Sequence, residues 1–286
     1  MDHHARGRFW LMLAVAVALL AAGLPACASF TGIATFASLS ASGAGYDAIT
    51  KDYIGAIDRR KQYQPQKFQG ELEVLKRRRE AQQASLDVLQ QTITDYMQGL
   101  GGLASGNIRT YDKSLQELSE NLHKASLLDD REKDAVGALS TLLARSVTAV
   151  YRQHEIRKLI QDGNQPLQDV VMATRKIVKN GIIADLQAES ALVERYYDNF
   201  MFAPGNPVEP VAMALARETK VEALGRVDNR VRSARRYNAV LDKIALGHQY
   251  LYDHLDMIGD DKLGRRFEPY IEALRTAYRN LLDVAR

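Results

Sequence analysis

The chain has 286 residues, of which 46% are apolar and 26% are charged, and its formal net charge is +3. This composition is typical of a globular protein and excludes a disordered or collagen-like chain. A single cysteine, Cys27, excludes an internal disulfide framework and a cysteine-rich zinc or iron–sulfur site. The near-neutral charge argues against a carrier of nucleic acid, which would need a strong basic excess.

The first 26 residues have the pattern of an export signal. Arg6 and Arg8 precede an uncharged apolar run over residues 9–24, and small residues follow it. This run is short for a membrane span, which needs about 20 residues. We therefore expect a signal peptide over residues 1–26 rather than a retained membrane anchor. Its removal would take away two arginines and one aspartate, which lowers the net charge from +3 to +2.

Two cleavage patterns overlap at the end of this segment. Ala26-Cys27-Ala28 fits the A-x-A pattern of ordinary signal peptidase, which would release a soluble chain that begins at Ser29. Leu24-Pro25-Ala26-Cys27 resembles the lipobox of bacterial lipoproteins. That resemblance implies cleavage between Ala26 and Cys27 and a lipid on the Cys27 sulfur. An unpaired cysteine has little other use in an exported protein, so its position favours the lipoprotein interpretation.

The resemblance also implies where the protein resides. Two or three acyl chains hold a protein durably on a membrane, so the contact with the membrane would run through the lipid on Cys27. In a Gram-negative host, Ala28 after the cysteine implies sorting to the outer membrane, facing the periplasm. The segment that follows is rich in Ala, Ser, Thr and Gly, and over residues 27–45 it predicts a lipid-anchored tether or a weak first helix.

Beyond residue 45 the apolar residues recur at steps of three and four, as in Leu86, Leu89, Ile93, Tyr96 and Leu100. This is the period of an amphipathic helix, and no comparable alternating run predicts a strand. Long segments without proline leave room for long helices. We expect an all-α fold, an elongated antiparallel bundle of about seven helices over residues 46–286, several of them longer than 30 residues: 46–64, 66–98, 108–126, 130–162, 165–201, 208–258 and 261–286.

Glycine, proline and aspartate predict the boundaries between these helices. We expect turns at Gly99-Leu100-Gly101-Gly102 and at Gly106-Asn107. Asp162-Gly163-Asn164 predicts a stop and restart, and marks a possible subdivision of the bundle near residue 163. The segment 203–207 is the clearest loop, and Pro269 predicts the start of the last helix or a break just before it.

Two basic segments lie within the expected helices, Lys76-Arg77-Arg78-Arg79 and the arginines between residues 226 and 236. Successive helical residues point all round the axis, so we expect solvated surfaces with ion pairs; contact with lipid head groups is the alternative. The histidines do not have the spacing of a metal site, so we expect no metal. The histidines that follow the expected signal peptide are His123, His154, His248 and His254.

The densest aromatic segment ends the fifth expected helix. Tyr196, Tyr197, Phe200 and Phe202 lie there within seven residues, directly before the loop at 203–207. Large aromatic side chains usually enter a core, which predicts a packed bundle end. The functional alternative is an exposed tip, and these four residues are then candidates for binding a partner.

Motifs of known catalytic and cofactor sites are missing from the sequence, so we expect no enzyme and no cofactor. The favoured hypothesis is a cell-envelope lipoprotein that acts as a scaffold or binding protein through helix faces or the bundle tip, with another envelope protein as its partner. Two alternatives remain. One is a soluble exported protein that binds a small ligand. The other is an enzyme that uses His154, His248 or buried carboxylates in a polar cavity.

Overall fold

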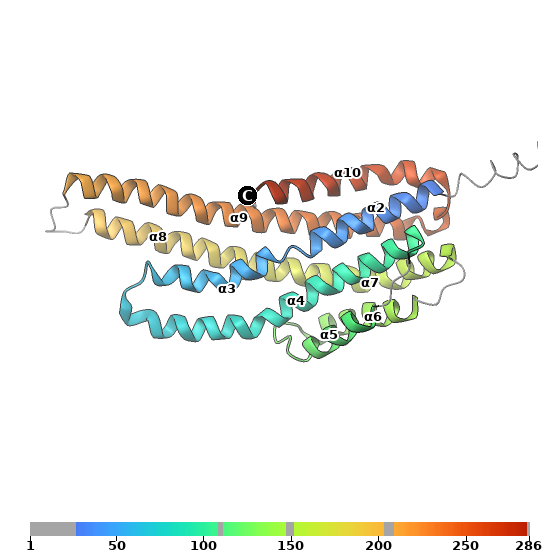
Figure 1. Ribbon diagram of the computed structural model, residues 1–286, viewed down its shortest axis with the longest axis horizontal. Helices are drawn as coiled ribbons and strands as arrows, with labels where there is room; N and C mark the ends of the chain where they lie inside the picture. The colour runs from blue at the N-terminus through green and yellow to red at the C-terminus, as the bar shows by residue number, and fades with distance from the viewer. Residues whose placement is uncertain (1–26, 108–110, 147–151, 203–208, 285–286) are drawn as a thin grey trace, which may run out of the picture.

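A computed structural model describes residues 27–107, 111–146, 152–202 and 209–284. This part of the chain is 91% helical and contains no strand, which confirms the all-α prediction. The helices lie along one axis and form an elongated bundle (Figure 1). The expected signal peptide, its cleavage after Ala26, and the expected loop at 203–207 lie outside the described residues.

The described part contains nine α-helices, one π-helical segment and two 3-10 turns. Several helical runs exceed 30 residues, as expected: α4 has 37 residues, α9 has 44, and α7, η2 and α8 follow one another without a break. The elements are α2 (Cys27–Ala44), α3 (Ala48–Lys61), η1 (Gln66–Phe68), α4 (Gln69–Ser105), α5 (Asp112–Leu122), α6 (Asp130–Ser146), α7 (Arg152–Ile177), η2 (Val178–Ile183), α8 (Ala184–Phe202), α9 (Pro210–Asp253), η3 (Leu255–Met257) and α10 (Asp261–Val284).

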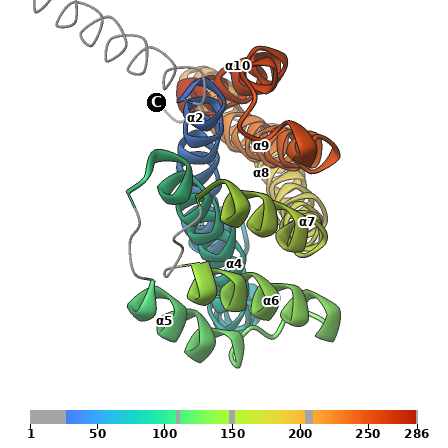
Figure 2. The same cartoon turned by 90° about the vertical axis from the view of Figure 1, so that its right-hand side faces the viewer.

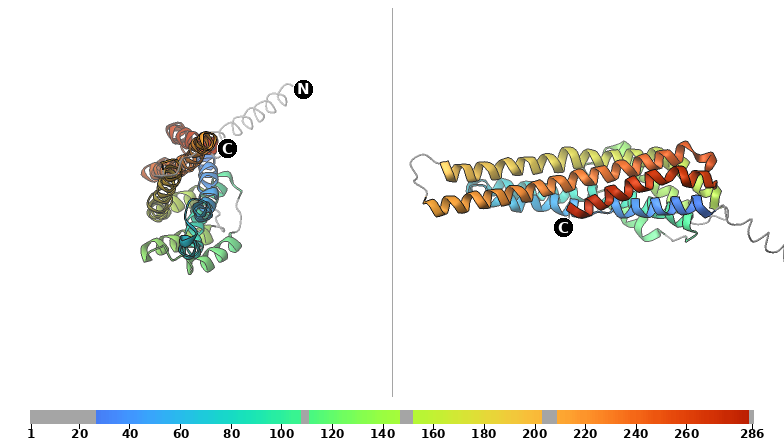
Figure 3. Two further views of the ribbon diagram at one scale, coloured as in Figure 1. Left: turned by 90° about the vertical axis from the view of Figure 1, so that its left-hand side faces the viewer. Right: turned by 90° about the horizontal axis from the view of Figure 1, so that it is seen from above.

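The path of the chain gives the bundle two distinct ends. We call the end where α2 begins the proximal end, and the end where α8 stops and α9 begins the distal end (Figure 1). The run α2–α3 leads outward, α4 returns, α7–α8 leads outward again, and α9 returns. Helices α5 and α6 lie along one side, against α4, and α10 covers only the proximal half (Figures 1 and 2). Seen from above, α8 and α9 extend beyond α3 (Figure 3).

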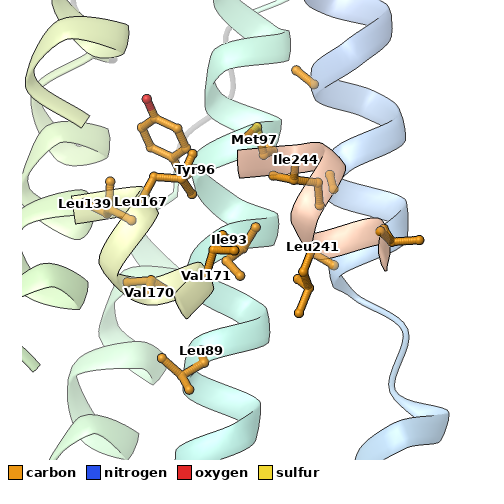
Figure 4. Packing of buried hydrophobic residues seen from close by; sticks show 14 of the residues in the cluster. Leu89, Ile93, Tyr96, Met97, Leu139, Leu167, Val170, Val171, Leu241 and Ile244 are labelled. Carbon is orange, nitrogen blue, oxygen red and sulfur yellow. The ribbon is translucent and has the colours of Figure 1, made fainter. Parts of the chain in front are cut away.

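The core follows the apolar faces that the sequence predicts. Leu89, Ile93 and Met97 of α4 meet side chains of α7 and α9 in a continuous buried cluster. Figure 4 shows α7 contributing Leu167, Val170 and Val171 and α9 contributing Leu241 and Ile244. Burying one such side chain contributes about 1.5–3 kcal/mol relative to leaving it in water, so these faces hold the long helices together.

Of the two alternatives for residues 27–45, the structure has the first helix and not the tether: residues 27–44 form helix α2, which packs against α4 and α10. Ile33, Phe36 and Ala37 are completely buried. The Phe36 ring meets the Phe267 ring edge to face, with centroids 5.1 Å apart. Small residues serve close packing here: a Cβ on Gly101 of α4 would lie 3.3 Å from the Cβ of Ala37. The segment is therefore part of the core rather than a flexible spacer.

Two predicted turns are absent because their glycines serve helix contacts. Helix α4 runs through Gly99-Leu100-Gly101-Gly102 and ends at Ser105, where Gly106 adopts a φ of 79°. That left-handed conformation suits glycine and confirms the turn at Gly106-Asn107. Helix α7 likewise runs through Asp162-Gly163-Asn164 without the predicted stop and restart.

Two prolines lie inside helices rather than at their starts. Pro166 is inside α7, and Pro269 is inside α10, so the prediction that Pro269 marks a helix start or break is wrong. A proline leaves the carbonyl four residues earlier without its helical donor. Here those carbonyls belong to Asp162 and Arg265, both exposed, so water can satisfy them.

Gly163→Ala tests the close packing of α7 on α4. A Cβ at residue 163 would lie 2.7 and 2.8 Å from Cε2 and Cζ of the buried Tyr96 ring. We expect the variant to lose about 1–3 kcal/mol in urea unfolding, because this overpacking outweighs the better helix propensity of alanine. Gly137→Ala is the control: nothing lies within 4 Å of its Cβ, so it should gain up to about 1 kcal/mol. A stabilised Gly163→Ala protein would contradict the packing.

Candidate functional site: an aromatic cleft at the distal end

The aromatic segment at the end of α8 is largely exposed. Tyr196 is 45% exposed, Phe200 46% and Phe202 68%, whereas Tyr197 is half-buried. The expectation of a packed bundle end therefore fails for three of the four residues. Large exposed aromatic side chains that lie together are typical of binding surfaces.

A cleft of about 780 Å³ lies beside this segment. One wall is the face of α8 that carries Leu192, Arg195, Tyr196, Asn199 and Phe200, which are spaced as one side of a helix. The other wall comes from the connection between α3 and α4 and from the first turn of α4. Its lining residues are Tyr63, Gln64, Pro65, Phe68 and Glu71. Of the four aromatic candidates, Tyr196 and Phe200 line the α8 wall, whereas Tyr197 and Phe202 do not. Nothing in the sequence indicated that the second wall lies opposite.

Ring contacts fix the base of the cleft. The Tyr63 ring meets the Tyr196 ring edge to face, with centroids 5.5 Å apart and planes at 72°. Tyr197 stands at 90° to Tyr196, with centroids 5.3 Å apart, and burial raises the pKa of the Tyr197 hydroxyl. Edge-to-face pairs of this kind are favourable by about 0.5–1.5 kcal/mol each beyond simple burial. Contacts among the rings of Tyr63, Tyr196 and Tyr197 therefore hold the two walls of the cleft together.

A buried ionic network joins α3 to α8 immediately proximal to the cleft. The Arg59 guanidinium donates two hydrogen bonds to the Glu189 carboxylate, at 2.9 and 3.2 Å, and pairs with Asp52 at 3.0 Å. Glu189 is only 1% exposed. Arg230 of α9 pairs with the same Asp52 oxygen at 3.1 Å. Burial raises the pKa of Asp52, and the charges of Arg59 and Arg230 oppose that rise.

A second part of the network corrects the prediction for Lys76-Arg77-Arg78-Arg79. Arg79 is buried: it pairs with Asp185 of α8 and donates to the carbonyl of Tyr53, whose ring lies 4.8 Å from its guanidinium carbon. Arg60 of α3 donates to the same Asp185 oxygen at 2.6 Å. Lys76 is partly exposed and pairs with Asp58 at 2.9 Å, as a helix surface should. Arg77 and Arg78 are exposed, so the prediction of a solvated surface holds for three of the four residues. It fails for Arg79, which joins α4 to α8.

The basic segment of α9 agrees better with its prediction. Arg226 and Arg232 pair with acidic residues one turn earlier on the exposed surface, Glu222 and Asp228. Such exposed pairs contribute about 0–1 kcal/mol. Arg230 differs from these two arginines, because it pairs with Asp52 and belongs to the buried network.

A polar chain crosses the core of the proximal half. The His248 ring is completely buried; its Nε2 lies 2.7 Å from the Tyr96 hydroxyl and its Nδ1 lies 2.9 Å from the Asn164 side-chain oxygen. Asn164 in turn donates to Gln249 at 2.8 Å. Burial lowers the pKa of His248 to about 3. The Tyr96 hydroxyl also lies 3.0 Å from the Leu159 carbonyl oxygen, so its one proton is shared between that carbonyl and Nε2 of His248. In the tautomer that donates from Nδ1 to Asn164, the neutral imidazole accepts at Nε2, and its buried position has a structural explanation.

His248→Gln tests this assignment through pH. The unfolded chain takes up a proton near pH 6.5 and the folded chain only near pH 3, so the wild type loses stability as the pH falls between these values. Relative to the glutamine variant, we expect a further loss of about 2–3 kcal/mol between pH 6 and pH 4 in urea unfolding. Parallel pH profiles for the two proteins would contradict a neutral buried imidazole.

A second groove, of about 720 Å³, lies between α2 and α4 in the proximal half. Its lining includes the hydroxyl groups of Thr35, Ser38 and Ser42, the Gln98 amide and the Arg275 guanidinium. This combination of small polar groups suits a small polar ligand. The Arg275 guanidinium pairs with Glu272 of the same helix, so an anionic ligand would have to compete with that carboxylate.

The described residues contain neither a cluster of metal ligands nor a membrane-spanning helix. No three His, Cys, Asp or Glu side chains gather there as metal ligands would. His154 is exposed, and the His254 ring stacks on Tyr250 with centroids 4.1 Å apart. No helix in the described ranges is long and apolar enough to cross a membrane.

Comparisons with known proteins give no relative. No protein family matches the chain, and neither a curated protein nor a solved structure matches it.

Proposed function

We propose that the protein is a cell-envelope lipoprotein that binds a partner protein at its distal end. A lipid on Cys27 would hold the proximal end of the bundle on a membrane, the outer membrane facing the periplasm if the host is Gram-negative. The bundle would then project its aromatic cleft away from that surface. Its work would be binding or scaffolding without catalysis.

One observation carries the proposal: the aromatic cleft is lined by the last part of α8, and α8 stops at the end of the bundle opposite the first residue of α2, which is Cys27 (Figure 1). An anchor at one end and a binding surface at the other end would let the protein bind a partner at a distance from the membrane. The α7–η2–α8 run alone has 51 residues, which span about 75 Å at 1.5 Å per residue. Because α2 packs into the core, the anchor connects directly to a rigid body.

The test places a photo-crosslinking amino acid at residue 200 or at residue 172 in the full chain, expressed in a Gram-negative host. Met172 is 57% exposed on α7, away from the cleft, and is the matched control. We expect a protein adduct from residue 200, none from residue 172, and loss of both the adduct and the acyl label in Cys27→Ser. Equal adducts from the two positions, or unchanged membrane attachment of Cys27→Ser, would refute the proposal.

The groove between α2 and α4 favours a second candidate, a soluble exported protein that binds a small polar ligand. This protein would begin at Ser29 after ordinary cleavage and would hold its ligand near Arg275. Ligand-dependent thermal shifts that disappear in Arg275→Ala, in a chain with no lipid, would favour this candidate over the first.

A further inference from the structure

We infer that the distal cleft receives an amphipathic α-helix of the partner, which continues the position of α3 along α8. This inference rests on the proposed function, since it names the kind of partner the cleft would bind. It goes beyond that proposal by specifying the secondary structure, the anchor spacing and the charge pattern of the partner segment.

The first argument is continuity with the contact between α3 and α8. Asp185, Glu189, Leu192, Tyr196 and Asn199 follow one another on α8 at steps of four, three, four and three residues. This is the spacing of a seam that packs against a neighbouring helix. The first two residues of the seam are held by Arg60 and Arg59 of α3.

The seam on α8 continues beyond the end of α3, the helix against which it packs. Helix α3 ends at Lys61, whereas α8 continues to Phe202, and Figures 1 and 3 both show α8 extending beyond α3. The remaining members of the seam line the cleft instead of a helix contact. From Leu192 to Phe202, α8 offers about 15 Å of length at 1.5 Å per residue, which is just under three turns of a second helix. The cleft is thus an unfilled continuation of an existing helix pair.

The second argument is charge. Arg195 lies on the α8 wall and Glu71 on the α4 wall, and neither forms an ion pair among the described residues. A helix placed between the walls would be complemented by an acidic residue on its α8 side and a basic residue on its α4 side. One charge of each sign gives no attraction to an anionic lipid surface, so the lining favours a protein segment over a membrane.

The apolar residues that line the cleft determine which side chains of a partner helix would bind there. Tyr63, Phe68, Tyr196 and Phe200 come from both walls. A partner helix lying along the seam would present apolar side chains at positions i, i+4 and i+7 to these rings, which is the usual way a groove receives an amphipathic helix. Aromatic pockets of this kind supply most of the energy of helix binding.

The experiment uses the acylated full chain in nanodiscs and two display libraries of equal peptide length. One library presents a helical scaffold with a randomised seam, and the other presents proline-rich extended peptides. We expect helical binders whose enrichment falls at least about tenfold on Phe200→Asp, the loss of one aromatic anchor, and stays unchanged on Met172→Asp. In Arg195→Glu, the selected acidic residue should change to a basic one.

Each other outcome overturns the inference. If extended peptides were the main binders, the cleft would bind an extended segment instead of a helix. If the full chain associated with itself in analytical ultracentrifugation, a second copy would be the occupant. If no helical binder exceeded the Phe200→Asp background, the cleft would not bind a helix. The failure remains separable from failure of the proposed function. If residue 200 formed an adduct in cells but the crosslinked partner segment were not helical, the inference of a partner helix would fail. The proposal of a lipid-anchored adaptor would still stand.

Discussion

Arg59→Leu is expected to lower the free energy of unfolding by about 3–5 kcal/mol, because it leaves the Glu189 carboxylate buried without a partner. Both oxygens of that carboxylate accept hydrogen bonds from Arg59, and Glu189 is almost completely removed from solvent. Asp52 would keep Arg230, so the cost falls mainly on Glu189. Urea unfolding followed by circular dichroism measures the difference.

Two further variants separate burial from charge. Arg59→Leu combined with Glu189→Leu removes both charges and should recover most of the lost stability, since a buried pair replaced by apolar residues is often neutral. Arg232→Leu breaks an exposed pair with Asp228 and should change stability by less than about 1 kcal/mol. If Arg59→Leu proved as mild as Arg232→Leu, the network would not be the clamp between α3 and α8.

The second large effect concerns binding rather than stability. Phe200→Asp places a charge among the rings of the distal cleft, and we expect it to weaken partner binding about 30-fold or more, as the loss of an aromatic anchor worth about 2 kcal/mol does. Because Phe200 is about half exposed, the unfolding free energy should change little. The yield of the adduct with a crosslinker at the neighbouring residue 196, compared at equal protein levels, measures the effect.

A conservative variant keeps this prediction specific. Phe200→Tyr retains the ring and should bind the partner nearly as the native chain does, whereas Phe200→Asp should not. Binding that survives both changes would place the partner elsewhere on the bundle. Binding lost together with helical content would instead indicate a structural role for the ring.

Helix faces were predictable from the sequence because burial depends on the period of the apolar residues. Leu86, Leu89, Ile93 and Tyr96 step by three and four, and all four are buried. Period and length together were enough for the all-α bundle. The aromatic residues of α8 were also identifiable as a local cluster, but the sequence alone favoured a packed end over an exposed one.

The predictions that glycine and proline end a helix were wrong at several positions, because tertiary contacts allow these residues inside helices. Gly163 permits the close approach of the Tyr96 ring, and Gly101 that of Ala37, and neither ends a helix. A local pattern cannot distinguish a glycine that breaks a helix from one that admits a neighbour, because the neighbour lies far away in the sequence. The small residues of α2 were misjudged for the same reason.

The sequence contains a signal for the buried ionic network, in the position of two charges on apolar helix faces. Arg79 lies seven residues after Leu72 and seven before Leu86, on the same buried stripe of α4. Glu189 similarly lies between Leu186 and Val193 on the buried face of α8. A charge on an apolar stripe indicates a buried partner, although only the folded structure shows which partner it is. Arg79 pairs with Asp185 of α8, and Glu189 pairs with Arg59 of α3.

Mass spectrometry of the mature amino terminus, purified from host membranes, tests the account most directly. The anchored adaptor predicts Cys27 as the first residue, carrying diacylglycerol on sulfur and no residue of 1–26. An unmodified chain that begins at Ser29, or one that retains the leader, would contradict it.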